Sequence, residues 1–186
     1  IMMNDSSGGA YLFLDNQDRV VFANSRWVVQ RLAARQRGNV WTFEIDGEWD
    51  IKPHVPHDCL NWDTWFPSGE CDKVTTVISD AAGRLWWTTR NGRLGTLDPA
   101  TGKVAIVPLG EEIQNALAMD SRAVYVLSDH AQYAFAADTG GKPVQLWRTA
   151  YDRGTKRKIG SINQGSGTTP TLLGEKWITF ADNADG

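Results

Sequence analysis

The sequence has no apolar run that approaches the ~20 residues needed to cross a bilayer as a helix. It also lacks a basic excess, because 19 lysines and arginines face 22 aspartates and glutamates. Duplex nucleic acid requires a concentrated basic surface. The one basic cluster, residues 153–158, is interpreted as a solvated loop. We therefore expect neither a membrane span nor a nucleic-acid partner.

Catalytic signatures are equally scarce. The sequence has no G-x-S-x-G nucleophile elbow. The glycine-rich segment 165–167 lacks the lysine and the following helix of a phosphate-binding loop. No acid–base pair or nucleophile is evident, so the catalytic residues stay unknown, and the sequence leaves open whether the protein is an enzyme.

The sequence is rich in glycine, with 18 residues, and in tryptophan, with nine, and both lie among short apolar runs separated by turn signals. Residues 74–107 predict four strands with glycine-containing turns between them. The expected strands are 74–79, 84–89, 93–98 and 103–107. This segment is therefore predicted to form one four-stranded antiparallel sheet.

The same order of strands and turns recurs along the chain. The predicted units span residues 10–51, 73–109 and 112–152, with a partial copy over 167–186 and insertions at 52–72 and 153–166. Four-stranded units at a spacing of roughly forty residues are typical of propeller blades. A pair of β-sandwich domains is the alternative. The tandem Trp86 and Trp87 favour blades, because successive strand residues point to opposite faces and would need a sheet on each side.

Two stretches resemble known propellers. DAAGRLWWTTRNGRLGTLDPATGKV, residues 80–104, resembles a blade of the virginiamycin B lyase and gluconolactonase-like families, and AFAADTGGKPVQLW, residues 134–147, resembles the quinoprotein (PQQ)-like repeat. The resemblance implies an all-β fold, a β-propeller with about three complete four-stranded blades plus a partial blade of a larger, six- to eight-bladed ring. The chain is expected to be a processed or truncated piece, with the remaining blades supplied by the rest of the protein or by another chain. Such propellers are usually exported, which implies a periplasmic or extracellular location.

The expected ligand site lies on one face of the propeller. Both insertions emerge on that face, together with the turns between the second and third strands, whereas the opposite face is expected to carry tight turns that serve folding. The inner-strand entrances place Tyr11, Thr76, Asn115 and Thr168 there, and the turns add Asn91, Asp129, His130, Asp182 and Asn183. Such a ring could coordinate Ca²⁺ through oxygen atoms, as the gluconolactonase resemblance implies, or could simply satisfy channel water and strand ends.

The first insertion holds the only two cysteines. Cys59 and Cys71, with His54 and His57, could form a loop-closing disulfide, remain free thiols or bind zinc, and the disulfide is the preferred interpretation. Trp62 and Trp65 in the same loop offer an aromatic surface for a partner or a sugar, although packing onto the propeller explains them equally well. Quinoprotein dehydrogenases have an adjacent-cysteine disulfide at their cofactor, and its absence here argues against PQQ.

Two function classes follow from these residues. The first is a non-catalytic propeller that binds a small molecule or a protein partner on the loop-rich channel face. The alternative is an enzyme of the gluconolactonase, lyase or quinoprotein-dehydrogenase type, with a metal ion or a quinone in the channel.

Overall fold

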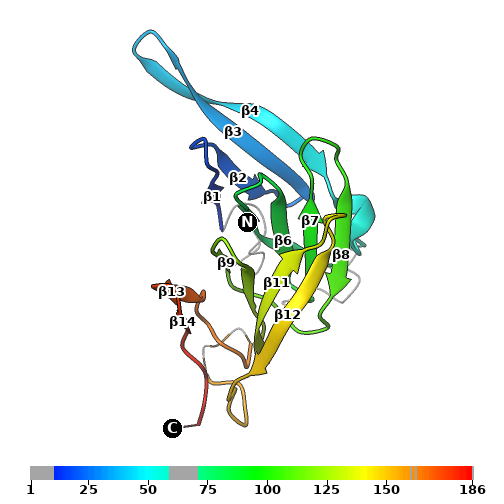
Figure 1. The fold of residues 1–186 in the computed structure, drawn as a ribbon, viewed down its shortest axis with the longest axis vertical. Helices are drawn as coiled ribbons and strands as arrows, with labels where there is room; N and C mark the ends of the chain where they lie inside the picture. Colours follow the sequence, from blue (N-terminus) through cyan, green and yellow to red (C-terminus); the bar gives the residue numbers. More distant parts are fainter. Residues whose placement is uncertain (1–10, 59–70, 160, 162, 186) are drawn as a thin grey trace.

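The computed structural model describes residues 11–58, 71–159, 161 and 163–185. Its strands form three four-stranded antiparallel sheets and one two-stranded sheet, and in each sheet neighbouring strands follow one another in the chain (Figure 1). We name these sheets blades 1 to 4. Blade 1 consists of β1 (Phe13–Leu14), β2 (Val20–Ala23), β3 (Val28–Arg37) and β4 (Val40–Asp50). Blade 2 consists of β5 (Val74–Ser79), β6 (Leu85–Thr89), β7 (Arg93–Leu97) and β8 (Val104–Pro108).

Blade 3 consists of β9 (Ala118–Met119), β10 (Val124–Leu127), β11 (Ala131–Ala137) and β12 (Pro143–Ala150), and the partial blade 4 of β13 (Thr171–Leu173) and β14 (Trp177–Thr179). The 3-10 turn η1 (Lys52–His54) follows blade 1. No helix in the described ranges is long and apolar enough to cross a membrane. The predicted architecture of three complete blades and a partial fourth is therefore confirmed.

Blade 2 shows how turn chemistry sets the strand boundaries. Its first strand has the predicted bounds, and its three turns contain Gly83, Gly92 and Gly102, all at positive φ. At Gly92 a side chain would be doubly unfavourable, because φ is +81° and an added Cβ would lie 2.1 Å from the Glu111 carbonyl oxygen. Glycine at this position therefore lets the turn of blade 2 approach the start of blade 3.

The tandem tryptophans divide between two cores, as predicted. Trp87 packs with Val21 and Val29 of blade 1, and Trp86 packs with Val126 and Phe135 of blade 3. Both indoles are at most 2% exposed. Each face of blade 2 is thus covered by a neighbouring sheet, which is the packing expected of propeller blades.

A glycine in close contact with a tryptophan ring recurs in blades 1 and 2. An added Cβ at Gly95 would lie 2.1 Å from the Trp87 indole, and one at Gly47 would lie 2.3 Å from the Trp49 indole. The Trp87 ring lies across the neighbouring strand, the Trp49 ring lies along its own strand β4, and in both places only a residue without a side chain leaves room for the ring. These positions are therefore set by packing rather than by backbone conformation.

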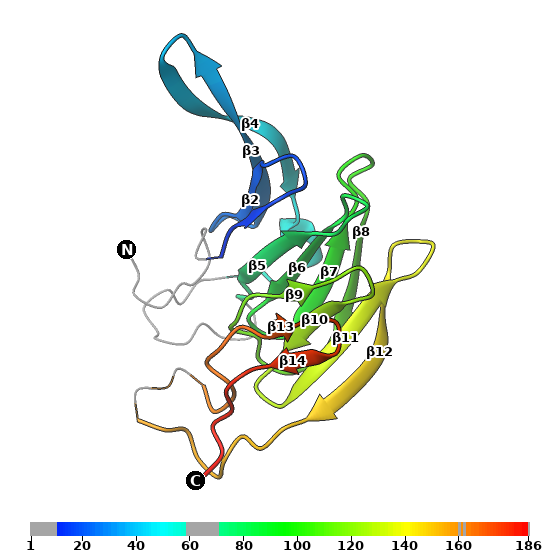
Figure 2. The same cartoon turned by 60° about the vertical axis from the view of Figure 1, so that its left-hand side comes forward.

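The outer hairpin of blade 1 is longer than the sequence analysis anticipated. β3 has 10 residues and β4 has 11, against 5 in each of β7 and β8. Pairing with β2 stops at Leu32, so the hairpin beyond that point, residues 32–45, projects as a two-stranded ribbon that we call the arm (Figures 1 and 2). The tip of the arm lies on the face that carries the turns between the third and fourth strands of the blades. The face expected to carry only tight turns therefore also carries the longest projection in the described chain.

A β-bulge changes which face of β4 is apolar. The register shifts between Arg31, which pairs with Gly47, and Leu32, which pairs with Ile45, so that Asp46 has no partner on β3. Trp49 and Val29 form a pair on the side of blade 2, whereas Ile45, Phe43 and Trp41 lie on the opposite side. Strict alternation would place all of these odd-numbered residues on one face.

Candidate functional site

The predicted face exists as a row of contacts between blades. The turns between second and third strands bind the segments that lead into the first strand of their own blade or of the next blade. Arg90 N donates to the Lys73 carbonyl within blade 2, and Ile113 N donates to the Arg90 carbonyl at the start of blade 3, each over 2.9 Å. Asp129 N donates to the Glu112 carbonyl at 2.8 Å. The turns and the interblade connections therefore meet at one end of the sheets.

Three side chains from this face form one cluster, which we call the Asp129 cluster. Asp129 Oδ1 accepts from His130 Nδ1 at 2.9 Å, and Asp129 Oδ2 accepts from Arg153 Nη2 at 3.0 Å. Arg153 also contacts His130 Nε2. The cluster thus joins the blade 3 turn to the second long connection.

The Asp129 cluster combines fixed and accessible groups. Asp129 is 8% exposed and also accepts from Glu112 N at 2.9 Å, so its position is determined on three sides. The His130 side chain is 45% exposed. Arg153 Nε is buried without a hydrogen-bond partner in the described residues. The cluster therefore exposes an imidazole and part of a guanidinium to solvent.

A second group of polar residues lies against this cluster. Tyr151 donates through its hydroxyl to the Ser128 carbonyl at 2.7 Å and accepts from Ser166 N at 2.8 Å. Burial raises the pKa of Tyr151. Asn115 Nδ2 donates to the Ser166 carbonyl at 2.9 Å, and Ser166 Oγ lies 3.1 Å from Thr168 Oγ1. Asn115 and Thr168 are thus brought together, as the alignment of inner-strand entrances predicted.

The turn of blade 4 reaches the same place. Asn183 Nδ2 donates to the Gln164 carbonyl at 3.3 Å and to the Gly165 carbonyl. An added Cβ at Gly165 would lie 2.2 Å from Asp129 Cα, so this segment packs directly on the Asp129 cluster. Asp182 is exposed and accepts from Ala184 N at 3.2 Å, which is a turn contact.

Two predicted site residues lie elsewhere. Thr76 is 2% exposed inside β5, and the Asn91 turn is bound to Asp72 rather than to the Asp129 cluster. Asp72 is fully buried and accepts from Asn91 N at 2.8 Å, Thr89 Oγ1 at 2.7 Å and Arg93. This carboxylate fixes the turn of blade 2. The side-chain amide nitrogen of Asn91, Nδ2, is buried without a hydrogen-bond partner in the described chain.

The first insertion is only partly described. Trp62, Trp65 and Cys59 lie outside the described residues, and the Cys59–Cys71 disulfide stays a prediction. Cys71 is buried and its backbone forms a bridge with His57. His57 Nδ1 lies 2.8 Å from the Val55 carbonyl.

The residues present do not fit a metal centre. Over the described ranges, no group of three or more His, Cys, Asp or Glu side chains is placed to hold a metal ion. Asp129, the best-placed carboxylate of the predicted ring, has its oxygen atoms directed to Glu112 N, His130 and Arg153. We derive no chemistry from Ca²⁺ or from a quinone.

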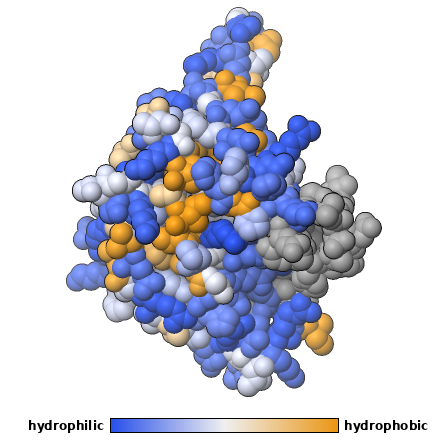
Figure 3. Space-filling model, turned by 90° about the vertical axis from the view of Figure 1, so that its right-hand side faces the viewer, coloured by the Kyte–Doolittle hydropathy of each residue, from blue (hydrophilic) through white to orange (hydrophobic). Residues whose placement is uncertain are grey.

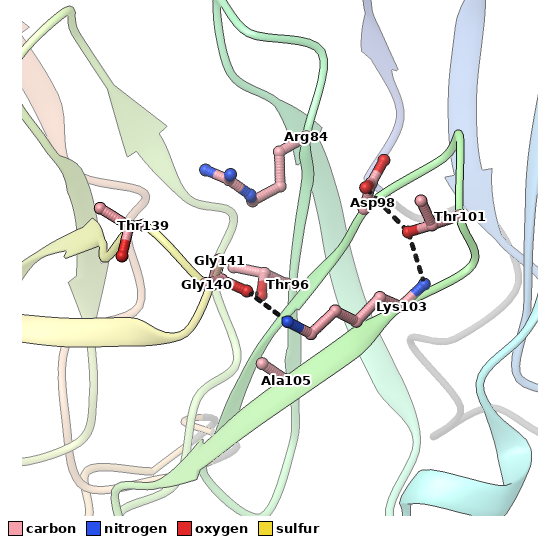
Figure 4. Close-up of a pocket in the computed structure, with 9 residues that line it drawn as sticks. All are labelled: Arg84, Thr96, Asp98, Thr101, Lys103, Ala105, Thr139, Gly140 and Gly141. Carbon is pink, nitrogen blue, oxygen red and sulfur yellow. Dashed lines mark hydrogen bonds between the residues drawn. The ribbon is translucent and has the colours of Figure 1, made fainter.

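A pocket of about 310 Å³ lies on the opposite face, between the turns of blades 2 and 3 (Figure 4). Lys103 Nζ donates to the Gly140 carbonyl at 2.9 Å, and Thr96 Oγ1 donates to the Gly141 carbonyl at 2.5 Å. A hydrogen bond from Thr101 lowers the pKa of Asp98 at its rim. The lining residues are Arg84, Thr96, Asp98, Thr101, Lys103, Ala105, Thr139, Gly140 and Gly141.

The polar lining of this pocket is largely engaged in holding two hairpin turns together. The sequence analysis did not predict this pocket. The feature that could have indicated it is the pair of similar turns at 98–103 and 138–142. The sequence analysis also missed Arg153, which it placed in a solvated loop, and Tyr151. Nothing in the sequence links those two residues to residues 128–130, because the contact spans more than twenty residues.

No protein-family model matches the chain. An uncharacterized protein of Archaeoglobus fulgidus is 30% identical over 177 residues, which cover 87% of this chain and 32% of that protein. The crystal structure of BamB from Moraxella catarrhalis superposes with a TM-score of 0.53 and 14% identity, over 89% of this chain and 43% of that one. The chain therefore spans about a third of its sequence relative. The likeness to BamB, itself a propeller, shows the fold and confirms the β-propeller assignment.

Proposed function

We propose that the chain is a segment of a non-catalytic β-propeller that binds a ligand or a protein partner on its loop-rich face. The Asp129 cluster is the observation that supports this most directly. It joins Asp129, in the turn of blade 3, to Arg153, in the connection that follows this blade, and it leaves the imidazole of His130 accessible. Fixed polar groups at the junction of several loops are the usual basis of recognition.

The charge near the cluster favours an acidic group on the guest. Lys156, Arg157 and Lys158 follow Arg153 in the same connection, and all three are exposed. Lys158 Nζ donates to the Ala184 carbonyl at 2.9 Å, which ties this basic segment to the end of blade 4. A carboxylate or phosphate beside Arg153 would meet a positive surface on the loop side and a donor on the cluster side.

We further propose that additional blades complete the ring. Blade 4 has only two described strands, and Trp177, 72% exposed, lies on its outer face with Leu173. On blade 1, Leu12 and Leu14 are exposed on the face turned away from blade 2. Between blades 1 and 2 and between blades 2 and 3, apolar sheet faces of this kind are covered by the neighbouring blade.

Export from the cytoplasm is also part of the proposal, and it rests on the expected Cys59–Cys71 disulfide. Mass spectrometry of the intact chain checks it, because reduction of one disulfide adds two hydrogen atoms. An unchanged mass after reduction would remove this support for an exported location.

The enzymatic alternative would need metal ligands or quinone contacts in the channel, and no specific observation on the described residues favours it. The binding proposal is tested by titrating the protein with a hexaglutamate peptide and, separately, with succinate. We expect NMR shifts in the backbone amides of residues 128–130 and 153–158, and we expect Arg153→Gln to weaken binding at least tenfold.

Lys103→Gln is the matched control, since it removes one positive charge from the pocket on the opposite face. It should leave the affinity within twofold of the original. Loss of binding in Lys103→Gln with retention in Arg153→Gln would show that the ligand binds the opposite face, beside Lys103. The absence of any NMR shift would reject an acidic ligand.

A further inference from the structure

The arm carries an apolar strip that nothing in the described chain covers. Its cross-strand pairs on one face are Leu32 with Ile45, Ala34 with Phe43, and Gln36 with Trp41. The three large side chains, Trp41, Phe43 and Ile45, are 66%, 66% and 60% exposed. We call these six residues the arm strip. Apolar side chains are also visible on the projecting arm in Figure 3. A soluble protein rarely leaves such a contiguous surface without a partner.

The charges of the arm are all engaged on or beside the hairpin. Residues 30–48 contain three arginines and three carboxylates, so this segment has no net charge. Asp46 accepts from Arg31 at 3.0 Å and lies 3.8 Å from Arg35, and Glu44 accepts from Arg37 at 2.5 Å. The sixth charged group, Glu48, accepts from Gln30 at 2.7 Å.

This neutrality limits what can bind the arm strip. An anionic membrane surface attracts segments with a basic excess, and residues 30–48, which include the arm, have none. A charged peptide would have to leave its own charges unpaired against an apolar face, which is costly. The suitable occupant is therefore itself apolar on one face and electrically neutral.

The length of the arm excludes an ordinary blade as the cover for its tip. The outer strands of blades 2 and 3 have 5 to 8 residues, whereas β3 and β4 have 10 and 11. A further blade of the usual size would cover blade 1 as far as Leu32 and leave Trp41 and Phe43 uncovered. The occupant must be another ribbon of comparable length.

We propose that the arm strip binds the arm strip of a second copy of this chain. The hairpin of residues 30–48, which includes the arm, itself has the required length, apolar face and neutrality. Aromatic side chains present 150–250 Å² each, so one arm strip offers about 500 Å² and two bury about 1,000 Å², the lower limit for a specific interface.

The contact is isologous, because the same patch is used on both copies, and it closes as a dimer. An arm docked on the open face of blade 4 would instead be heterologous and would propagate into rings or filaments. The arm projects away from blades 2 and 3, so two copies can meet without a collision of the sheets (Figure 2).

Sedimentation equilibrium of the full chain between about 5 and 500 µM tests the proposal. An interface at this lower limit should give a dissociation constant of about 10–100 µM. Trp41→Thr combined with Phe43→Thr should raise it at least tenfold, since both residues are central to the arm strip and threonine keeps the strand conformation. Far-UV circular dichroism verifies that the variant stays folded.

The control variant is Leu173→Thr with Trp177→Thr, which removes the comparable apolar pair from blade 4. It should leave the dimer unchanged. Hydrogen exchange supplies a readout without substitution: amides of residues 40–45 should become more protected as the concentration of the unmodified chain rises.

Three results would each overturn the proposal: a chain that stays monomeric at 500 µM, a dimer that survives the arm substitutions, or a dimer lost only in the blade 4 control. In the last case the contact would be on the open face of blade 4. None of these outcomes depends on the Asp129 cluster, so the result is independent of the proposed ligand site.

Discussion

Blade 2 and blade 1 are built from the same pattern of four strands, yet their tryptophans differ in burial. In blade 2, Trp86 and Trp87 are buried between two neighbouring sheets. In blade 1, Trp49 is half-buried against blade 2, while Trp41 of the same strand is 66% exposed. The comparison teaches that burial in this fold is supplied by the next sheet and not by the strand itself, so an apolar residue is only as buried as its neighbour allows.

The sharpest test of this comparison replaces one tryptophan in each blade. Trp87→Ala should lower the free energy of unfolding by about 3–5 kcal/mol, because it empties a core position between blades 1 and 2. Trp41→Ala should change it by less than about 0.5 kcal/mol, as expected for an exposed site. Urea denaturation followed by circular dichroism measures both. Equal losses would show that the arm is part of the cooperative core.

The two blades also differ in their carboxylate centres. Asp72 is fully buried and binds three donors, whereas the Asp46 side chain is 25% exposed and pairs with arginines at the surface. Asp72→Asn should cost about 2–4 kcal/mol, since it removes the negative charge beside Arg93 and one of the two acceptor oxygens that fix the turn of blade 2. Asp46→Asn should cost less than about 1 kcal/mol.

The same denaturation experiment checks this pair at pH 7. A larger loss in Asp46→Asn than in Asp72→Asn would contradict the view that burial by the next sheet sets the strength of these contacts.

A third comparison uses the glycines beneath the tryptophans. Gly95→Ala should destabilise by about 1–3 kcal/mol, because Trp87 is enclosed and cannot move away from a new methyl group. Gly47→Ala should cost less than half as much, because Trp49 lies at the edge of blade 1 and can shift. Thermal unfolding of the two variants gives the ranking, and a larger effect at Gly47 would show that Trp49 is the more rigid ring.

The smallest expected effect is a pH dependence at the junction of blades 2 and 3. Burial opposes ionisation of Glu111, but hydrogen bonds from Ser128 and Arg148 outweigh it and lower the pKa of this carboxyl. A depressed folded-state pKa adds stability above the ordinary pKa of glutamate, and this contribution is lost as the pH falls through the folded value.

Glu111→Gln should therefore be less stable than the unmodified chain by about 1 kcal/mol at pH 7, the usual size of a net hydrogen bond. The gap should close as the pH is lowered below about 4. Urea midpoints between pH 2 and 7 measure it. A gap that is constant over this range would show that the charge of Glu111 does not contribute.

The sequence predicted local features well and long-range contacts poorly. The strand Val74–Ser79 and the glycine turns of blade 2 follow from alternation and turn chemistry, which act within a few residues. The first strand of blade 3 is only Ala118–Met119, shorter than the six-residue first strand of blade 2, because the preceding residues Ile113 and Leu117 are buried outside the ladder. Periodicity cannot show whether an apolar residue is buried in a ladder or beside it.

The same limit applies to the candidate site. The turn alignment placed Asp129, His130 and Asn183 on one face, and the structure gathers them with Asn115 and Thr168 around the second connection. The turn alignment could not predict that Arg153 would form a hydrogen bond with Asp129, or that Asp72 would bind the Asn91 turn. Both contacts join residues from different blades or connections, and one sequence contains no signal for their pairing.

The bulge at Asp46 has a genetic consequence. A single in-frame codon determines the side to which the arm strip points. Inserting one codon between Arg31 and Leu32 would give Asp46 a partner on β3 and restore strict alternation, and Trp41, Phe43 and Ile45 would then turn toward the side of Trp49. Every apolar residue would be kept and only its direction would change. A three-nucleotide insertion could thus convert an outward-facing surface into one that faces blade 2, so that closely similar chains need not share the same assembly.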